Sequence, residues 1–283
     1  MQIVDEKLFF APSDLITFME SPFASHMERR RLMDHSVSEL MDPTDAMLKA
    51  LQDKGFEHED AFLKTLRSER KSVVEIDRAS SDVMQARTKA AMEDGADVIA
   101  QAYLQLDNFG GLADFLVKVP GNSTLGDFHY EIWDTKLSKK MKPYFAIQLC
   151  CYAEMIEHMQ GVKPVNVAIV LGDNTNSALK VRDYFGYYSA LKAAFLEFHD
   201  QWAPENPPDP AESSTHGRWS EHAAKLLEDR RHLSLVANIT GAQIKRLEAA
   251  EITTVDDLAN SGQDQISKLN RDIFHRLKAQ AKI

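Results

Sequence analysis

Two segments in the middle of the chain place carboxylates and a lysine within apolar runs. Asp114 interrupts the run 112–117, and a buried carboxylate is costly unless it has a partner. In the run 130–136, Asp134 and Lys136 share one face because side chains alternate along a strand. If the two runs are neighbouring strands, two carboxylates could bind a divalent metal ion, with the lysine orienting or activating a water. The alternative is a structural Asp–Lys pair on a sheet face.

A predicted helix follows these acids and carries a glutamine and a tyrosine. Gln148 and Tyr152 are four residues apart, so they lie side by side on the helix. The helix begins soon after Lys136, where the preceding strand delivers the chain. An amide and a phenol there can hydrogen-bond a phosphate and stack a base. The alternative is that Tyr152 belongs to the core and Gln148 is solvated.

A histidine lies on the apolar face of an earlier predicted helix. His58 shares that face with Leu51, Gly55 and Phe62. A histidine in such a position is commonly a hydrogen-bonded core residue. However, a helix-interior glycine costs about 1 kcal/mol relative to alanine and lets a backbone or ligand come close. A neutral imidazole could therefore serve as a further ligand for magnesium or, more readily, manganese.

Hydrophobic periodicity predicts the elements that must position these side chains. The expected helices cover residues 15–20, 44–67, 81–93, 144–160, 187–202 and 219–231, with a helical tail over 233–283. The expected strands cover residues 71–76, 98–106, 112–119, 128–137, 165–171 and 178–184. This order predicts an α/β core with a mixed central sheet flanked by helices, followed by a small all-helical C-terminal module.

A proline-rich segment divides the chain. Four prolines lie between Pro204 and Pro210, which is typical of a linker. We therefore expect a core over residues 1–203, a linker with a closing helix over 204–238, and a helical module over 239–283.

Composition and charge narrow the class of function. The chain has 283 residues, an ordinary globular composition and a formal net charge of −10, so it cannot coat nucleic acid generally. A local exception follows Lys136, where Lys139, Lys140 and Lys142 form a basic segment. The two cysteines are neighbours, and no long apolar run or secretory signal occurs. We expect a cytoplasmic protein without a membrane partner.

Four motifs in this order resemble the RecB-like branch of the PD-(D/E)XK nucleases. They are Gly55-Phe56-Glu57-His58-Glu59, Gly111-Leu112-Ala113-Asp114, Trp133-Asp134-Thr135-Lys136 and Gln148-x-x-x-Tyr152. The combination is more specific than any single motif. The chain looks like the N-terminal part of bacterial RecB-like nuclease–helicase proteins. The resemblance implies a restriction-endonuclease-like core and a Mg²⁺- or Mn²⁺-dependent, exonuclease-like activity in repair, recombination or defence. The expected partners are DNA, as single strands or duplex ends, and a helicase.

The resemblance also implies a role for each matching residue. Asp114 and Asp134 would be metal-binding acids, Thr135 would offer its backbone carbonyl to the metal, and His58 would be an additional ligand. Lys136 would position the attacking water. The DNA contacts would come from Gln148 and Tyr152, with Lys139, Lys140 and Lys142 as the basic track. Glu57 and Glu59 receive no role and are expected on a solvated helix face.

The chain departs from many relatives in one respect. Those relatives hold an iron–sulfur cluster with four cysteines, whereas the corresponding stretches here are Ser21-Pro22-Phe23 and residues 214–219. We expect no cluster, closure by apolar packing with Trp219, and solvated side chains for His216 and His222.

The C-terminal tail is similar to helix-hairpin-helix DNA-binding modules. Glu251 stands where the hairpin glycine of those modules would be, and its carboxylate would repel a phosphate. DNA binding and simple helical packing therefore both remain open for the tail. For the whole chain, two alternatives to a DNA nuclease also remain: a nuclease-fold DNA-binding module that serves a helicase, and an enzyme that acts on RNA.

Overall fold

The computed structural model describes residues 1–4, 6–43, 46–69 and 72–283. The chain forms two compact units. Met1–Met19 and Thr44–Gln201 make up the first, which we call the sheet unit, and Glu20–Pro43 and Trp202–Ile283 make up the second, the helical unit. The sheet unit ends two residues before the predicted boundary at 203. In contrast, residues 20–43, which the sequence placed in the core, group with the helical unit.

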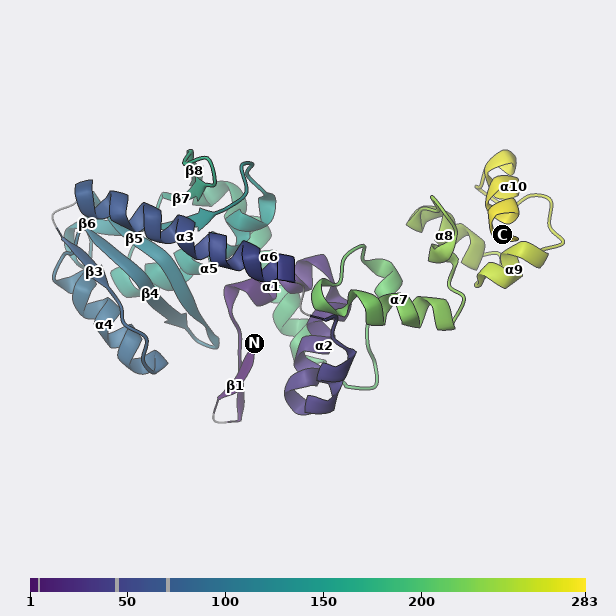
Figure 1. Cartoon of the computed structure of the whole chain (residues 1–283), viewed down its shortest axis with the longest axis horizontal. Coiled ribbons are helices and arrows are strands. Elements are labelled where there is room, and N and C mark those ends of the chain that lie inside the picture. The colour runs from purple at the N-terminus through teal and green to yellow at the C-terminus, as the bar shows by residue number, and fades with distance from the viewer. Residues whose placement is uncertain (5, 44–45, 70–71) are drawn as a thin grey trace. The chain divides into compact units, whose positions relative to one another are not determined.

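A six-stranded mixed sheet forms the centre of the sheet unit, in the order β3-β4-β5-β6-β7-β8 (Figure 1). The strands are β3 Val73–Glu75, β4 Val98–Leu106, β5 Phe109–Ser123, β6 Gly126–Lys136, β7 Asn166–Leu171 and β8 Asn176–Lys180. The pairs β3–β4 and β6–β7 are parallel, whereas the other neighbours are antiparallel. The predicted α/β class and mixed sheet are therefore confirmed.

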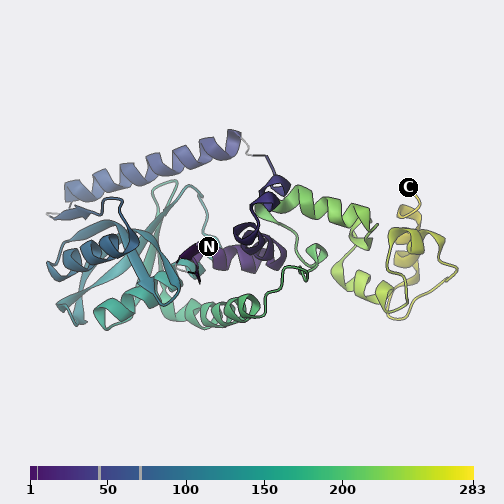
Figure 2. The same cartoon turned by 90° about the horizontal axis from the view of Figure 1, so that it is seen from below.

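Helices cover both faces of this sheet (Figure 2). On one face, α3 (Ala46–Glu69) packs Leu63 and Leu66 against β4 and β5. On the other face, α4 (Ser81–Glu93), α5 (Pro143–Gln160) and α6 (Val181–Asp200) share the main core. Two short strands, β1 Gln2–Val4 and β2 Lys7–Phe9, pair with each other before α1 (Pro12–Glu20).

Most predicted elements match closely, but β1 and β2 were not predicted, and the boundary between β8 and α6 was misplaced. The bounds of α4 and β4 are those expected, and α5 ends at Gly161, whose φ of 73° is the left-handed conformation that favours glycine. The strand predicted over 178–184 stops at Lys180, because Val181 already begins α6. The helix buries one residue every two turns: Val181, Tyr188 and Phe195. The hydrophobic pattern did not reveal this spacing, because the first residues of the helix continue a strand-like alternation. The predicted ends at 44 and 71 lie outside the described residues.

The helical unit contains α2 (Pro22–Met33), α7 (Ser220–Asp229), α8 (Gly241–Glu248), α9 (Val255–Asn260) and α10 (Arg271–Gln280). Trp219 makes the expected apolar packing, with Phe23 and Met27, whereas its role in closing the core stays a prediction. Its indole nitrogen donates to Glu28 Oε1 at 2.9 Å.

Ser21-Pro22-Phe23 and residues 214–219, the two stretches without cysteine considered above, meet within this unit. Ser21 Oγ lies 2.9 Å from His216 Nδ1, and both side chains are buried. The expectation of a solvated His216 is therefore wrong, because this hydrogen bond compensates for the burial of the ring. Across the described residues of the whole chain, no helix has the length and apolar character needed to span a membrane.

Candidate active site

The sheet register brings the two aspartates together. In the antiparallel pair β5–β6, Phe115 lies opposite Trp133 and Leu116 opposite Ile132. One step further in the same register, Asp114 lies opposite Asp134. The neighbouring strands that the sequence argument required are thus present.

Asp114 is held by the strand beside it. Its Oδ2 atom accepts hydrogen bonds from the backbone N–H of Thr135 at 2.8 Å and from the Thr135 hydroxyl at 2.9 Å. Threonine therefore fixes one carboxylate oxygen and leaves Oδ1 to face other groups. The structure assigns this clamping contact to Thr135, and the predicted use of its carbonyl as a metal ligand stays a prediction.

Asp134 is a buried acid beside a half-buried lysine. Its side chain is 4% exposed, and Lys136 Nζ lies 2.6 Å from Asp134 Oδ2. This contact is an ion pair without hydrogen-bond geometry, so Oδ2 accepts no hydrogen bond within the described part of the chain. Burial, followed by repulsion from Asp114, raises the pKa of Asp134 to about 7. Burial would lower the pKa of Lys136, but the carboxylate of Asp134 outweighs it and raises that pKa.

A third carboxylate, Glu59, reaches the same region from α3. Burial and the charge of Asp114 raise the pKa of Glu59 to about 7. Its Oε1 atom accepts a hydrogen bond from the Gln101 amide on β4. The expectation of a solvated helix face is therefore wrong for Glu59. Helical periodicity could not reveal it, because its burial depends on how α3 crosses the sheet.

His58 contacts β7, the strand that pairs with the Asp134 strand. Its Nε2 atom is 3.3 Å from the carbonyl oxygen of Val170. The helix face that the sequence predicted as buried is exposed towards the N-terminal end of α3, where Leu51 is 46% exposed. Apart from its chain neighbours and the nearby backbone of its own helix, no described atom lies within 4 Å of a Cβ built on Gly55. No other element therefore packs closely against Gly55 in this structure. The metal-ligand role of His58 stays a prediction.

Tyr152 is a core residue. Its hydroxyl donates to the carbonyl oxygen of Leu112 at 2.7 Å, and its ring is 3% exposed. Burial, followed by the charges of Asp134 and Asp114, raises its pKa. A phenol so enclosed cannot stack a base in this structure, so its visible role is to anchor α5 to the strand that carries Asp114. Gln148 beside it is half-buried and lies within hydrogen-bonding reach of the Tyr152 hydroxyl.

The three loop lysines follow β6 directly. Lys139, Lys140 and Lys142 are exposed between Lys136 and the start of α5. A Cβ on Gly172 would lie 2.2 Å from the carbonyl oxygen of Leu137, so only glycine lets this loop pass so close to β7. The basic segment thus leaves the sheet at the end where the acids lie.

The donor set fits a hard divalent cation. Asp114 and Asp134 supply carboxylate oxygens, and the buried Asp134 Oδ2 lacks a hydrogen bond. Magnesium often binds through only one or two carboxylates while keeping several waters. Within residues 1–4, 6–43, 46–69 and 72–283, however, no group of three or more His, Cys, Asp or Glu side chains is already arranged to hold an ion. Two aspartates, with Glu59 nearby, are therefore the ligands that the residues themselves support.

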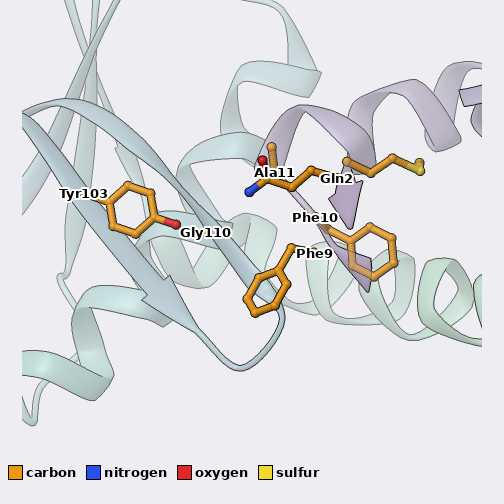
Figure 3. A pocket seen from close by; sticks show the side chains of 7 residues that line it. Gln2, Phe9, Phe10, Ala11, Tyr103 and Gly110 are labelled. Carbon is orange, nitrogen blue, oxygen red and sulfur yellow. The ribbon is translucent and has the colours of Figure 1, made fainter. Parts of the chain in front are cut away.

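A separate cavity lies beside the N-terminal strands (Figure 3). It encloses about 180 Å³, and Tyr103 lies over Gly110, whose added Cβ would sit 2.6 Å from the Tyr103 hydroxyl. The labelled side chains around it are Gln2, Phe9, Phe10, Ala11 and Tyr103. Because none of them is acidic or basic, the titratable cluster on β5 and β6 remains the better candidate for chemistry.

Comparison with protein-family models and with curated proteins found no match for the chain.

Proposed function

We propose that this chain is a Mg²⁺- or Mn²⁺-dependent deoxyribonuclease with a RecB-like, restriction-endonuclease-like core. The observation that carries the proposal is the pair Asp114 and Asp134, adjacent in register, with Lys136 2.6 Å from the buried acid. The mixed sheet with α3 on one face and α5 on the other supports the proposed fold.

The charges in the site favour a cation. Three carboxylates interact, and the pKa values of Asp134 and Glu59 are both raised to about 7 by burial and by Asp114. Lys136 pairs with Asp134, and the charges of Arg78 and Lys136 act on Glu59, yet the pKa values of both acids stay raised. A divalent ion held by Asp114 and Asp134 would supply the charge that polarises a phosphate and stabilises the leaving oxygen.

The protein's own groups would perform the remaining tasks. Lys136 stays protonated because its pKa is raised, so it acts as a donor that orients water and not as a base. Thr135 keeps Asp114 in place through two hydrogen bonds. Tyr152 joins α5 to the strand of Asp114, which would keep Gln148 beside the site. The proposed reaction is water attack on a DNA phosphodiester.

Substitution of Lys136 tests the proposal against a matched control. Lys118 on β5 is also a half-buried lysine paired with an aspartate, Asp97, at 3.1 Å, but it lies away from Asp114 and Asp134 in sequence and register. Lys136→Ala should reduce magnesium-dependent DNA hydrolysis roughly 100-fold or more while manganese binding persists. Lys118→Ala should retain the wild-type rate in proportion to its folded fraction.

Chelation provides the second arm of this test. EDTA should abolish hydrolysis, and added magnesium or manganese should restore it. Hydrolysis undiminished by EDTA would overturn the metal mechanism. Metal-independent DNA binding without any hydrolysis would favour the alternative of a catalytically weak DNA-binding module that serves a helicase.

A further inference from the structure

A second cavity adjoins the acids on the α3 side of the sheet. It encloses about 280 Å³, near the lower end of the range for small-molecule sites. It therefore has room for a single small unit and not for a base pair. Its lining comes from α3, β4 and the segment after β3: Phe56, Glu59, Asp60, Leu63, Glu75, Arg78, Ala100 and Gln101.

Gln101 connects this cavity to the proposed active site. Ala100 pairs with Phe115 and Ala102 with Ala113, so Gln101 stands across from Asp114. Its φ of 54° is unusual for a non-glycine residue inside a strand. Such strained residues persist where the surrounding structure holds them, and they cluster at binding and active sites.

The Gln101 amide holds a charged group on each side. Its nitrogen donates to Glu59, and its oxygen accepts from Arg78 Nη2 at 3.2 Å. The amide thereby joins the acid cluster to a guanidinium. A single side chain sets the positions of both.

Among the residues that line this cavity, Arg78 is the one whose positive charge can bind a ligand. The lining acids Asp60 and Glu75 pair with Lys64 at 2.6 Å and Arg67 at 2.7 Å. Arg78 makes no direct ion pair within the described part of the chain; it is bound through the neutral Gln101 amide, and its charge acts from a distance to lower the pKa of Glu59 against the effect of burial. Its guanidinium can therefore receive an anion, and phosphate matches its planar donor geometry.

An aromatic ring completes the cavity wall. Phe56 is 68% exposed, which is unusual for so large an apolar side chain next to a polar cavity. An exposed ring beside a guanidinium is a combination that binds single-stranded nucleic acid, because every base has a face that can stack.

We propose that this cavity binds one nucleotide of a single-stranded DNA end, next to the phosphate that is cut. Arg78 binds the phosphate of that nucleotide, Phe56 stacks on its base, and Gln101 holds Arg78 in register with the acids. The assignment rests on the proposed nuclease function, and it adds a preference for single strands over duplex.

The test measures binding of a fluorescein-labelled eight-nucleotide oligothymidine by anisotropy, in calcium and over a range of salt. Arg78→Gln should weaken binding about tenfold and flatten the slope of log affinity against log salt by roughly 0.7, the value for one phosphate contact to a single strand. Phe56→Ala should weaken binding by roughly 5- to 100-fold with the slope unchanged, because stacking carries no charge.

Arg87→Gln is the matched control. Arg87 is also an exposed arginine of the sheet unit, but it lines a different hollow beside α4. This variant should retain wild-type affinity, and melting temperatures of all variants should confirm that they are folded. Arg78→Lys, which keeps the charge, should recover the salt slope.

The outcomes separate this inference from the proposed function. If wild-type protein binds and cuts DNA, but Arg78→Gln and Phe56→Ala behave like Arg87→Gln, the cavity assignment is wrong and the nuclease proposal stands. If wild-type protein neither binds the oligonucleotide nor cuts any DNA with magnesium, the nuclease proposal itself fails. Equal losses on blunt duplex would show that the cavity does not select single strands.

Discussion

Two aspartates, one in each unit, have opposite environments. Asp134 in the sheet unit is buried, accepts no hydrogen bond at Oδ2 within the described residues, and has its pKa raised to about 7 by burial and by Asp114. Asp257 in the helical unit accepts three hydrogen bonds at Oδ2, from the N–H and hydroxyl of Thr253 and the N–H of Thr254, at 2.9–3.1 Å. Hydrogen bonds with the Thr254 side chain and with the other groups of Thr253 and Thr254 lower its pKa.

The difference shows where each unit can receive a ligand. In the hairpin between α8 and α9, Asp257 already occupies the backbone N–H groups of residues 253 and 254, which a phosphate would otherwise contact. Around Asp134, in contrast, three carboxylates interact, and the ion pair with Lys136 does not bring the pKa of Asp134 back to its ordinary value. A buried polar atom without a hydrogen bond, such as Asp134 Oδ2, is a position where a water or an ion can bind. We therefore place the chemistry in the sheet unit and a packing role in the tail.

The largest expected effect is that of Asp134→Asn. Nuclease activity should fall at least about 1,000-fold, because a metal-binding carboxylate is lost. The free energy of unfolding, in contrast, should increase. A folded-state pKa above the unfolded value means that stability is lost as pH rises from about 4 to 7. The neutral amide avoids that loss, so the free energy of unfolding at pH 8 should rise by on the order of 2 kcal/mol.

Urea denaturation at two pH values checks this prediction. The gain should disappear near pH 4.5, where the wild-type acid is itself protonated. Asp257→Asn is the comparison variant and should lose stability at pH 8, because it weakens the three hydrogen bonds at Oδ2. A loss of stability in Asp134→Asn at pH 8 would contradict the inference that burial and the charge of Asp114 make ionised Asp134 destabilising.

The second prediction compares the basic segments of the two units. Neutralising Lys139, Lys140 and Lys142 should flatten the slope of log DNA affinity against log salt by roughly 2 to 3 units, at about 0.7 to 0.9 for each phosphate contact. The matched triple variant in the helical unit replaces three exposed cations of the tail: Lys245, Arg246 and Lys268. That variant should keep the wild-type slope. The reverse result would move the DNA track to the tail.

Sequence patterns predicted the central residues of the candidate site but missed two residues beside them. The polar residue in an apolar strand revealed Asp114, and strand alternation placed Asp134 beside Lys136. The same signal was present at Gln101, within the apolar run of β4, but its positive φ and its two partners depend on long-range packing. Glu59 was missed for a related reason, since only the path of α3 across the sheet buries it.

The proposed DNA-contacting residues show the limit of spacing rules. Helical spacing correctly placed Gln148 beside Tyr152, but it could not say which of them would be buried. The structure satisfies the Tyr152 hydroxyl with a backbone carbonyl of β5, an acceptor that no local pattern reveals. The residue boundaries of the helical unit were likewise unpredictable, because 20–43 and 202–283 come together only in three dimensions.

The third prediction concerns a buried histidine in the helical unit. Burial, with help from Arg30 and Arg29, lowers the pKa of His26 to about 4. The folded state therefore disfavours the charged ring, and stability falls as pH drops from about 6.5 towards 4. Between pH 7.5 and 5 this single group should cost roughly 2 kcal/mol.

Tryptophan fluorescence during urea denaturation reports this loss, because the His26 ring lies 5.2 Å from that of Trp202. His26→Gln should remove most of the pH dependence, whereas His35→Gln, at an exposed position, should retain it. An unchanged pH dependence in His26→Gln would show that another group titrates.

The smallest effect is expected at the hairpin of the tail. Glu251 has a φ of 59°, a conformation that costs a non-glycine residue roughly 1 kcal/mol. Glu251→Gly should therefore raise the free energy of unfolding by no more than this amount. A more flexible unfolded chain offsets part of the gain. The variant also restores the glycine of helix-hairpin-helix modules and removes a carboxylate. If the hairpin bound DNA, affinity should increase several-fold. Because Asp257 already occupies the N–H groups of Thr253 and Thr254, we expect unchanged affinity in a salt titration. An increase would return DNA binding to the tail and weaken the contrast between the two units.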